Sequence, residues 1–180
     1  MKLAYVTLQG RGRTDALIAA VADLLTKDGL RLAGTVQSNI ERPNRKKCDM
    51  DLIILPDGPV VRISEDRGDL ARGCMLDSGA LEQTVVAVEQ RLPGAQVLIV
   101  NKFGKRESEG KGLVPIIAEA LSMGLPVLVG VNGLNLSSFL AFAGEDVQAL
   151  AADAPLIAAW CKTNLSDAEI AAFGAFLSDN

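Results

Sequence analysis

The sequence predicts an α/β fold with three layers, in which helices cover both faces of a mostly parallel sheet. Three observations support this prediction. Short runs of apolar, β-branched residues, such as 97–100 and 126–131, are typical of strands buried on both faces. Between such runs, apolar residues repeat every three or four positions, as in amphipathic helices. With 180 residues, 49% of them hydrophobic, the chain can form one core, and we expect a single domain over residues 1–180.

The first third of the chain predicts a strand, a glycine loop, a helix and a second strand. Lys2–Leu8 contains β-branched and aromatic residues in alternation, which favours the first strand. The loop Gln9–Arg13 follows, and a helix is expected from Thr14 to Gly29 because glycine commonly ends helices. Leu30–Val36 is the expected second strand, so the segment is a βαβ unit.

The middle of the chain predicts a polar connection and one antiparallel hairpin. Residues 37–49 contain the basic cluster 42–47, and we consider this cluster as a lid over a site. Met50–Leu55 and Val60–Ser64 flank a Pro-Asp-Gly-Pro turn, which predicts two strands of a hairpin.

The second half of the chain predicts two buried strands among helices, and a helical C-terminal tail. The strands are the two apolar runs named above, and a tight turn is expected at Asn132-Gly133. An Asp-Ser pair at 77–78 is a suitable cap for the first of these helices. The expected helices are 77–91, 113–123, 137–143, 153–163 and 167–178.

The charge distribution points to a local anion site. Residues 1–111 hold 17 bases against 15 acids, a balance of +2, whereas residues 112–180 hold one base against seven acids, a balance of −6. Ten of the bases fall in three loops. We therefore expect a small anionic ligand and no nucleic-acid partner, because nucleic-acid binding favours a broad basic surface with stacking aromatic residues.

Other features of the sequence disfavour or exclude membrane proteins, disulfide and zinc proteins, and histidine-dependent enzymes. No apolar run approaches the ~18 residues of a membrane span and no cleavable leader is visible, so we expect no membrane insertion. Three cysteines without a CxxC pair disfavour disulfides and zinc, which indicates a cytoplasmic protein. The chain has no histidine, which excludes Ser-His-Asp and Cys-His catalysis and imidazole-bound metals. No residues are assigned to a metal.

The N-terminal glycine loop invites comparison with the phosphate-binding P-loop, G-x-x-x-x-G-K-[ST]. The alignment puts Gly12, Arg13 and Thr14 on the last three positions, with Thr7 in place of the first glycine. Asp15 suits the helix dipole yet would repel a nearby phosphate. The alternative is an ordinary helix-capping loop. The candidate ligand-binding residues here are Gly10, Arg11, Gly12, Arg13 and Thr14.

The segment after Val97–Val100 is the second candidate. This buried strand leads into a glycine-rich loop with four bases, and such loops form ligand sites at the carboxyl edge of open α/β sheets. Asn101 and Lys102 occupy the positions where Walker B acids would hold Mg²⁺ and orient water. Asparagine is a weaker ligand for Mg²⁺ than a carboxylate. Lys102, together with Lys105, can neutralise a bound anion in place of the metal. Alternatively, Asn101 caps a turn and Lys102 points to water.

Glu107 and Glu109 are candidates for catalysis if the protein hydrolyses its ligand. Two positions apart, they would share a face in an extended loop and supply metal ligands or a base. The alternative is solvated surface charge. Cys74 is either a packing residue or a ligand for a soft metal or oxothio species.

The two loops resemble known families. Residues 6–36 and 97–107 are similar to the P-loop nucleoside triphosphatases first known from thermophiles. Their strand motif I-x-x-I-D-E-I-G-x-M-E resembles V-L-I-V-N-K-F-G-K-R-E here, with Asn101 and Lys102 in the two acidic places. The chain resembles more closely an uncharacterised bacterial domain family often encoded beside molybdate-transport genes. The family's motif V-N-K/R-F-G-K-x-E-x-E-G-x-G matches residues 100–112, and its C-x-L-D-x-x-x-L matches residues 74–81. The resemblance implies a P-loop-like fold, a site at the two loops and a link to molybdenum handling.

Three functions follow as hypotheses. The first is a binding protein with a degenerate P-loop, which holds a nucleotide or molybdate with little or no hydrolysis. The second is a slow Mg²⁺-dependent nucleoside triphosphatase. The third is an interaction protein with a vestigial nucleotide site. Its C-terminal helices would form a homo-oligomer or a partner surface through Leu156, Ile157, Trp160, Phe173 and Phe176.

Overall fold

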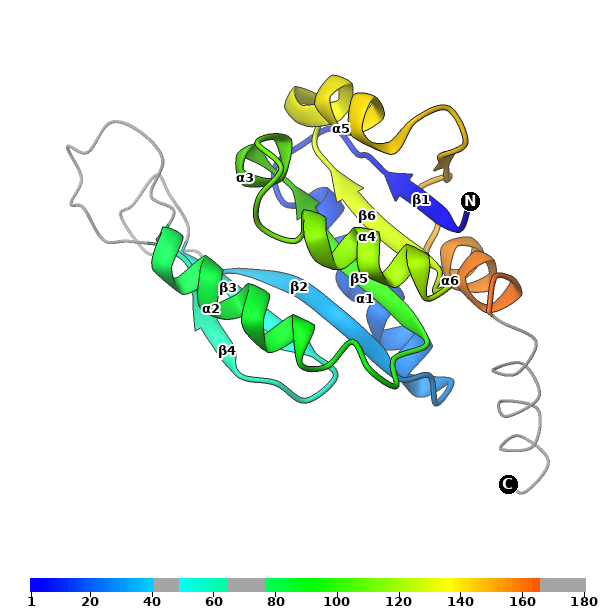
Figure 1. The fold of residues 1–180 in the computed structure, drawn as a ribbon, viewed down its shortest axis with the longest axis horizontal. Coiled ribbons are helices and arrows are strands. Elements are labelled where there is room, and N and C mark those ends of the chain that lie inside the picture. The colour runs from blue at the N-terminus through cyan, green and yellow to red at the C-terminus, as the bar shows by residue number, and fades with distance from the viewer. Residues whose placement is uncertain (41–48, 65–76, 166–180) are drawn as a thin grey trace.

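A seven-stranded sheet with helices on both faces organises the computed structural model of the chain (Figure 1). The structure describes residues 1–40, 49–64 and 77–165. The strand order is β4-β3-β2-β5-β6-β1-β7. The strands are β1 (Leu3–Val6), β2 (Leu32–Ile40), β3 (Asp49–Leu55), β4 (Val60–Arg62), β5 (Val97–Phe103), β6 (Val127–Val131) and β7 (Gln148–Ala149).

The strand directions agree with the predicted mostly parallel sheet. β2, β5, β6, β1 and β7 pair in parallel, while β3 runs antiparallel to both β2 and β4. The predicted hairpin is therefore confirmed as β3 and β4. Parallel strands end on the same side of a sheet, so the segments that follow β1, β5 and β6 meet at one carboxyl edge.

The helices form the two outer layers. They are α1 (Arg13–Lys27), α2 (Ser78–Glu89), α3 (Lys105–Ser108), α4 (Val114–Ser122), α5 (Leu136–Ala143) and α6 (Ala154–Thr163), with a 3₁₀ turn η1 (Gly133–Asn135). α1 and α6 cover one face of the sheet, and α2 and α4 cover the other (Figure 1). Asp77 caps α2 as predicted, because its carboxylate accepts a hydrogen bond from the Ala80 N–H at 3.0 Å.

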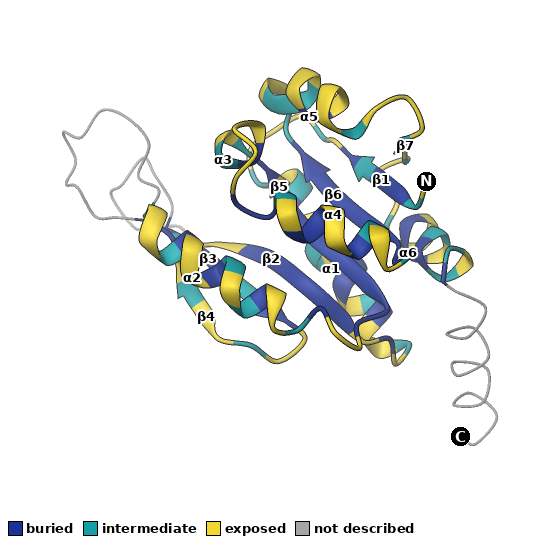
Figure 2. Ribbon diagram, in the orientation of Figure 1, coloured by how far each residue is buried: buried dark blue, intermediate teal, exposed yellow. Residues whose placement is uncertain are grey.

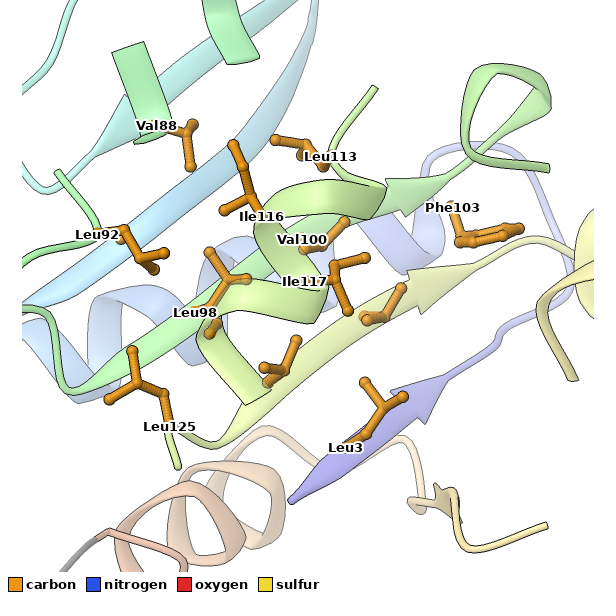
Figure 3. Packing of buried hydrophobic residues seen from close by; sticks show 14 of the residues in the cluster. Leu3, Val88, Leu92, Leu98, Val100, Phe103, Leu113, Ile116, Ile117 and Leu125 are labelled. Atoms are coloured by element: carbon orange, nitrogen blue, oxygen red, sulfur yellow. The ribbon is translucent and has the colours of Figure 1, made fainter. Parts of the chain in front are cut away.

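Alternation along the central strands divides the core between the two faces. On β5, Leu98 and Val100 pack toward Ile116 and Ile117 of α4 (Figure 3), whereas Val97 and Ile99 join the cluster under α1. The buried residues form a continuous band through the sheet (Figure 2). Apolar burial is the main stabilising contribution of such a core.

Tertiary pairing moves several element boundaries. β2 continues to Ile40 instead of Val36, because Gln37–Ile40 pair with residues 49–52 of β3. β5 continues through Asn101 and Lys102 to Phe103, which pairs with β6. Two elements were not expected: α3, within the predicted loop, and the exposed strand β7, which extends the sheet beside β1. The C-terminal segment is therefore not wholly helical.

Some expectations lie outside the described residues: the basic cluster 42–47, Cys74, and the helix 167–178 with Phe173 and Phe176. None of the helices in residues 1–40, 49–64 and 77–165 combines the length and apolar composition needed to cross a membrane.

Candidate functional site

A cavity of about 630 Å³ lies at the carboxyl edge of the sheet and brings the two predicted loops together. We call it the first cavity. Its walls come from the loop after β1, the first turn of α1, the ends of β2 and β5, and the segment after β6. The polar and glycine residues that line it are Thr7, Gln9, Gly10, Arg11, Gly12, Thr14, Asp15, Gln37, Asn39, Asn101, Lys102, Gly130, Asn132 and Gly133.

The loop after β1 places backbone groups on this cavity. Gly12 has φ 72°, in the left-handed region, and is the N-cap of the 15-residue helix α1. Glycine takes this conformation without the steric cost of a Cβ atom. Thr14 accepts a hydrogen bond from the Leu8 N–H at 3.1 Å, which ties the loop to the helix. The N-terminus of α1 therefore faces the cavity, and the helix dipole favours an anion there.

A polar network surrounds Asp15, and Asp15, Gln37 and Asn101 are its buried members. The Asn101 Nδ2 donates to Oδ1 of Asp15 at 3.0 Å, and the Asn39 Nδ2 donates to Oδ2 at 2.8 Å. The Gln37 N–H donates to Oδ1 of Asn101 at 3.1 Å, which sets the orientation of the Asn101 amide. The Gln37 side chain donates to Asn39 at 2.7 Å and to Asp15 at 3.4 Å. These bonds join the first turn of α1 to the ends of β2 and β5.

This network does not suit a Mg²⁺ site of the P-loop kind. Mg²⁺ requires oxygen ligands, preferably carboxylates, in near-octahedral geometry. At the Walker B position, Asn101 presents its amide nitrogen to Asp15, and the oxygens of Asp15 already accept amide N–H groups. No group of three or more carboxylate or thiol side chains among the described residues is arranged to hold a metal ion.

Lys102 contributes a positive charge to the site. It lies on β5 beside the buried Asn101, and its side chain is exposed on the cavity wall. Among the described residues, its ammonium makes no hydrogen bond or ion pair. A cation without a protein partner on a cavity wall is available for an anionic ligand. Arg11 also lines the cavity.

The segment after β5 is not an open loop, because Glu107 holds it in a compact turn. Glu107 is buried, and its carboxylate accepts the Gly104 N–H at 3.0 Å and the Leu113 N–H at 3.2 Å. Gly112 has φ 60°, and a Cβ atom there would lie 2.1 Å from Oε1 of Glu107. The position of the Glu107 carboxylate therefore requires a residue without a side chain at position 112.

This turn corrects the expectation for the two glutamates. Glu107 belongs to α3 and Glu109 is its C-cap, so the segment is not the extended loop in which the pair would share a face. Glu107 is buried and not solvated, whereas Glu109 is exposed. Neither lines the first cavity.

A second cavity of about 210 Å³ adjoins the first. It lies between α2, β3, α3 and the start of α4, and the two share Gln37, Met50, Asn101 and Lys102. Lys105 and Glu107 line this second cavity.

The structure brings most of the predicted ligand residues together. The first cavity is lined by Gly10, Arg11, Gly12, Thr14, Asn101 and Lys102. Arg13 is not among them, because its guanidinium turns back to the Gln9 carbonyl at 3.3 Å. Sequence reasoning missed Gln37 and Asn39. Their polar side chains two positions apart at the end of an apolar strand were the available signal.

The predicted C-terminal interaction surface is only partly exposed. Ile157 and Cys161 of α6 are buried against α1, and burial raises the pKa of the Cys161 thiol to about 12. Trp160 donates its indole N–H to the Gln148 side chain. Leu156 is 61% exposed. Ile157 therefore belongs to the core and not to an oligomer surface, because the apolar stripe of α6 packs on the domain itself.

The chain belongs to a family described as a protein of unknown function (DUF2478), whose model matches residues 3–160. The motif at 100–112 predicts an uncharacterised family, and the family that matches is one of unknown function. A curated relative, the molybdenum import ATP-binding protein ModC 2 of Bradyrhizobium diazoefficiens, is 30% identical over 166 residues. The match covers 92% of this chain but only 18% of the relative's length. No solved structure matches the chain significantly.

Proposed function

We propose that the protein binds a small oxyanion, free or as part of a nucleotide, in the first cavity, with little or no hydrolysis. The observation that carries the proposal is that Lys102, which has no ion-pair partner among the described residues, lines the same cavity as a glycine loop at the N-terminus of α1. Both features favour negative charge between them. The segment 7–14 is then a degenerate P-loop.

The name of the curated relative supports two ligand classes. That protein is an ATP-binding protein of molybdenum import, so nucleotides and molybdate are the candidates to test. Molybdate and a phosphate group are both tetrahedral oxyanions, and backbone N–H groups and a lysine suit either one. A nucleotide would also need space beyond its phosphates, which a cavity of about 630 Å³ provides.

Each site residue has a specific role in this proposal. Gly10 and Gly12 allow the backbone N–H groups of the loop to approach the oxyanion. Thr14 adds a hydroxyl, and Lys102 neutralises charge where other P-loop proteins use a metal. Arg13 has to leave the Gln9 carbonyl before it can contact a ligand.

The donor set argues against efficient hydrolysis. The end of β5 offers an amide and an ammonium instead of two carboxylates, and Asp15 is engaged by amide donors. Glu107 is occupied by two backbone N–H groups. The slow triphosphatase that uses Glu107 or Glu109 therefore has no observation in its favour and serves as the alternative outcome of the test.

Isothermal titration tests the proposal. The protein is titrated with a non-hydrolysable ATP analogue, with and without Mg²⁺, and with molybdate in phosphate-free buffer. We expect binding of at least one ligand without a requirement for Mg²⁺. Nucleotide binding that depends on Mg²⁺ would favour the triphosphatase, and no binding of either ligand would refute the proposal.

A matched pair of lysine variants locates the ligand. Lys102→Ala should weaken binding about tenfold, because one charge-assisted contact is worth roughly 1.5 kcal/mol. Lys111→Ala removes the same charge from an exposed position that lines neither cavity, and it should leave the affinity within about twofold.

A further inference from the structure

The second cavity differs from the first in its chemistry. Its base is apolar and comes from three elements: Leu52 on β3, Ile63 after β4 and Leu81 on α2, which form a small cluster of their own. Leu113, at the start of α4, adds to the apolar wall. Apolar walls of this kind favour a hydrophobic body over a hydrated ion.

The rim of this cavity is basic. Lys102, Lys105 and Arg106 all line it. Among the described residues, the ammonium groups of both lysines have no hydrogen-bond or ion-pair partner. Glu107 also lies on the rim, but its carboxylate is committed to the Gly104 and Leu113 N–H groups. Glu107 forms no ion pair with Lys102 or Lys105, so the two ammonium groups remain available to a ligand.

Arg106 differs from the two lysines, because its charge is paired with an acid. Its Nη2 pairs with Glu82, which leaves its Nε atom buried without a hydrogen-bond partner in the described part of the chain. A buried donor without a partner is unfavourable, and an acceptor group of a ligand in this cavity is one way to satisfy it.

Lys102 lines both cavities. Because they share Gln37, Met50, Asn101 and Lys102, an anionic group bound at Lys102 can carry a substituent from the first cavity into the second. The volume of about 210 Å³ exceeds the roughly 150 Å³ of an apolar protein cavity known to hold benzene, so a single ring fits.

We propose that the second cavity holds the apolar body of an organic anion whose charged group binds at Lys102. The ligand class is thus a phosphate or similar oxyanion ester with a compact, ring-sized apolar group. This inference rests on the proposed function for its anion site, and it adds a specificity pocket that free oxyanions do not use.

Phenyl phosphate is the probe, and inorganic phosphate is its matched control. In isothermal titration, we expect phenyl phosphate to bind about tenfold more tightly or better, because burial of the ring adds to the contacts of the anion. Leu81→Trp fills the cavity and should abolish this preference while phosphate affinity stays within about twofold. Circular dichroism verifies that the variant is folded.

A second measurement does not depend on any variant. Nuclear Overhauser effects from the phenyl protons of the bound probe should reach the methyl groups of Leu52, Ile63 and Leu81 in the wild-type protein. Effects that reach only Leu134 and Leu136, which line the first cavity, would overturn the inference.

The outcomes separate the two proposals. Equal affinity for both probes would overturn the specificity pocket and leave the oxyanion site in place. A phenyl phosphate preference that survives Leu81→Trp would also overturn it. A third outcome is that phenyl phosphate binds and gives nuclear Overhauser effects at Leu52, Ile63 and Leu81, while inorganic phosphate does not bind. This outcome would support the pocket and count against the proposed function. Absence of binding for both probes would overturn both.

Discussion

The two glycine-rich basic loops at the carboxyl edge look alike in sequence but differ in structure. The first, residues 7–12, lies on the cavity and leads directly into α1. The second, residues 104–112, folds on itself as α3 around the buried carboxylate of Glu107. In the first loop, glycine leaves the backbone accessible at the cavity wall. In the second loop, Gly112 makes room for the buried Glu107 carboxylate.

This difference shows that glycine and basic residues alone do not identify a ligand loop. A Cβ atom at Gly12 would meet nothing closer than 3.5 Å, at the Asn39 amide, whereas one at Gly112 would meet Glu107 at 2.1 Å. Open space beside Gly12 and close contact beside Gly112 predict different consequences for the same substitution.

The largest effect is expected for Gly112→Ala. The methyl group would displace the Glu107 carboxylate and leave backbone N–H groups without their acceptor, and φ 60° is unfavourable for alanine. We expect the free energy of unfolding to fall by about 3 kcal/mol in urea denaturation. Gly110→Ala is the control: its φ is 75° but no atom lies within 4 Å of the added Cβ, so about 1 kcal/mol is expected. Equal losses would contradict the packing role of Gly112.

Asp15→Ala should have the next largest effect. It removes the acceptor of the Asn101 and Asn39 amides, and Asn101 is 1% exposed. We expect a loss of about 2 kcal/mol in the free energy of unfolding, measured by the same denaturation. Asp23→Ala removes an exposed acid from the same helix and should change stability by no more than about 0.5 kcal/mol. A similar small effect at Asp15 would mean that the network contributes little to the first loop's position.

Gly12→Ala separates binding from stability. The left-handed conformation at φ 72° should cost about 1 kcal/mol of stability. Oxyanion affinity should fall about tenfold in isothermal titration, because the loop backbone has to shift at the cavity wall. Gly112→Ala, compared under conditions where it is folded, should bind within about threefold of the wild type. If Gly112→Ala weakened oxyanion binding and Gly12→Ala did not, the second loop and not the first would be the ligand loop.

The smallest effect is expected for Arg13→Ala. Its guanidinium hydrogen-bonds the Gln9 carbonyl and does not line the first cavity. Oxyanion affinity measured by titration should fall about twofold to threefold, through loss of a nearby screened charge. A loss as large as that of Lys102→Ala would show that Arg13 turns into the cavity on binding, as the lysine of a P-loop does.

Much of the site's location was predictable, because it depends on local patterns. The apolar run before Asn101 and the strand before the N-terminal loop place both loops at the carboxyl edge once a parallel sheet is assumed. Gly12 and Lys102 follow from that placement, and the structure puts them on one cavity.

The network around Asp15 was not predictable in the same way. Asp15 was expected to suit the helix dipole and to repel a nearby phosphate, and its hydrogen bonds from Asn39 and Asn101 were not expected. Asn39 was assigned to a polar connection, because nothing local indicates that β3 pairs with it and extends β2. Long-range strand pairing decides where such a strand ends.

The sequence by itself determined most of the strands and helices and the region of the site, since apolar periodicity and glycine positions depend on a few neighbouring residues. It did not indicate α3 or β7. The tertiary structure decided which polar groups are available. It paired Asp15 with amides from β2 and β5, committed Glu107 to backbone N–H groups, and left Lys102 unpaired among the described residues. The physical reason is that a buried polar group must find a partner, and the partner comes from whichever element packs beside it.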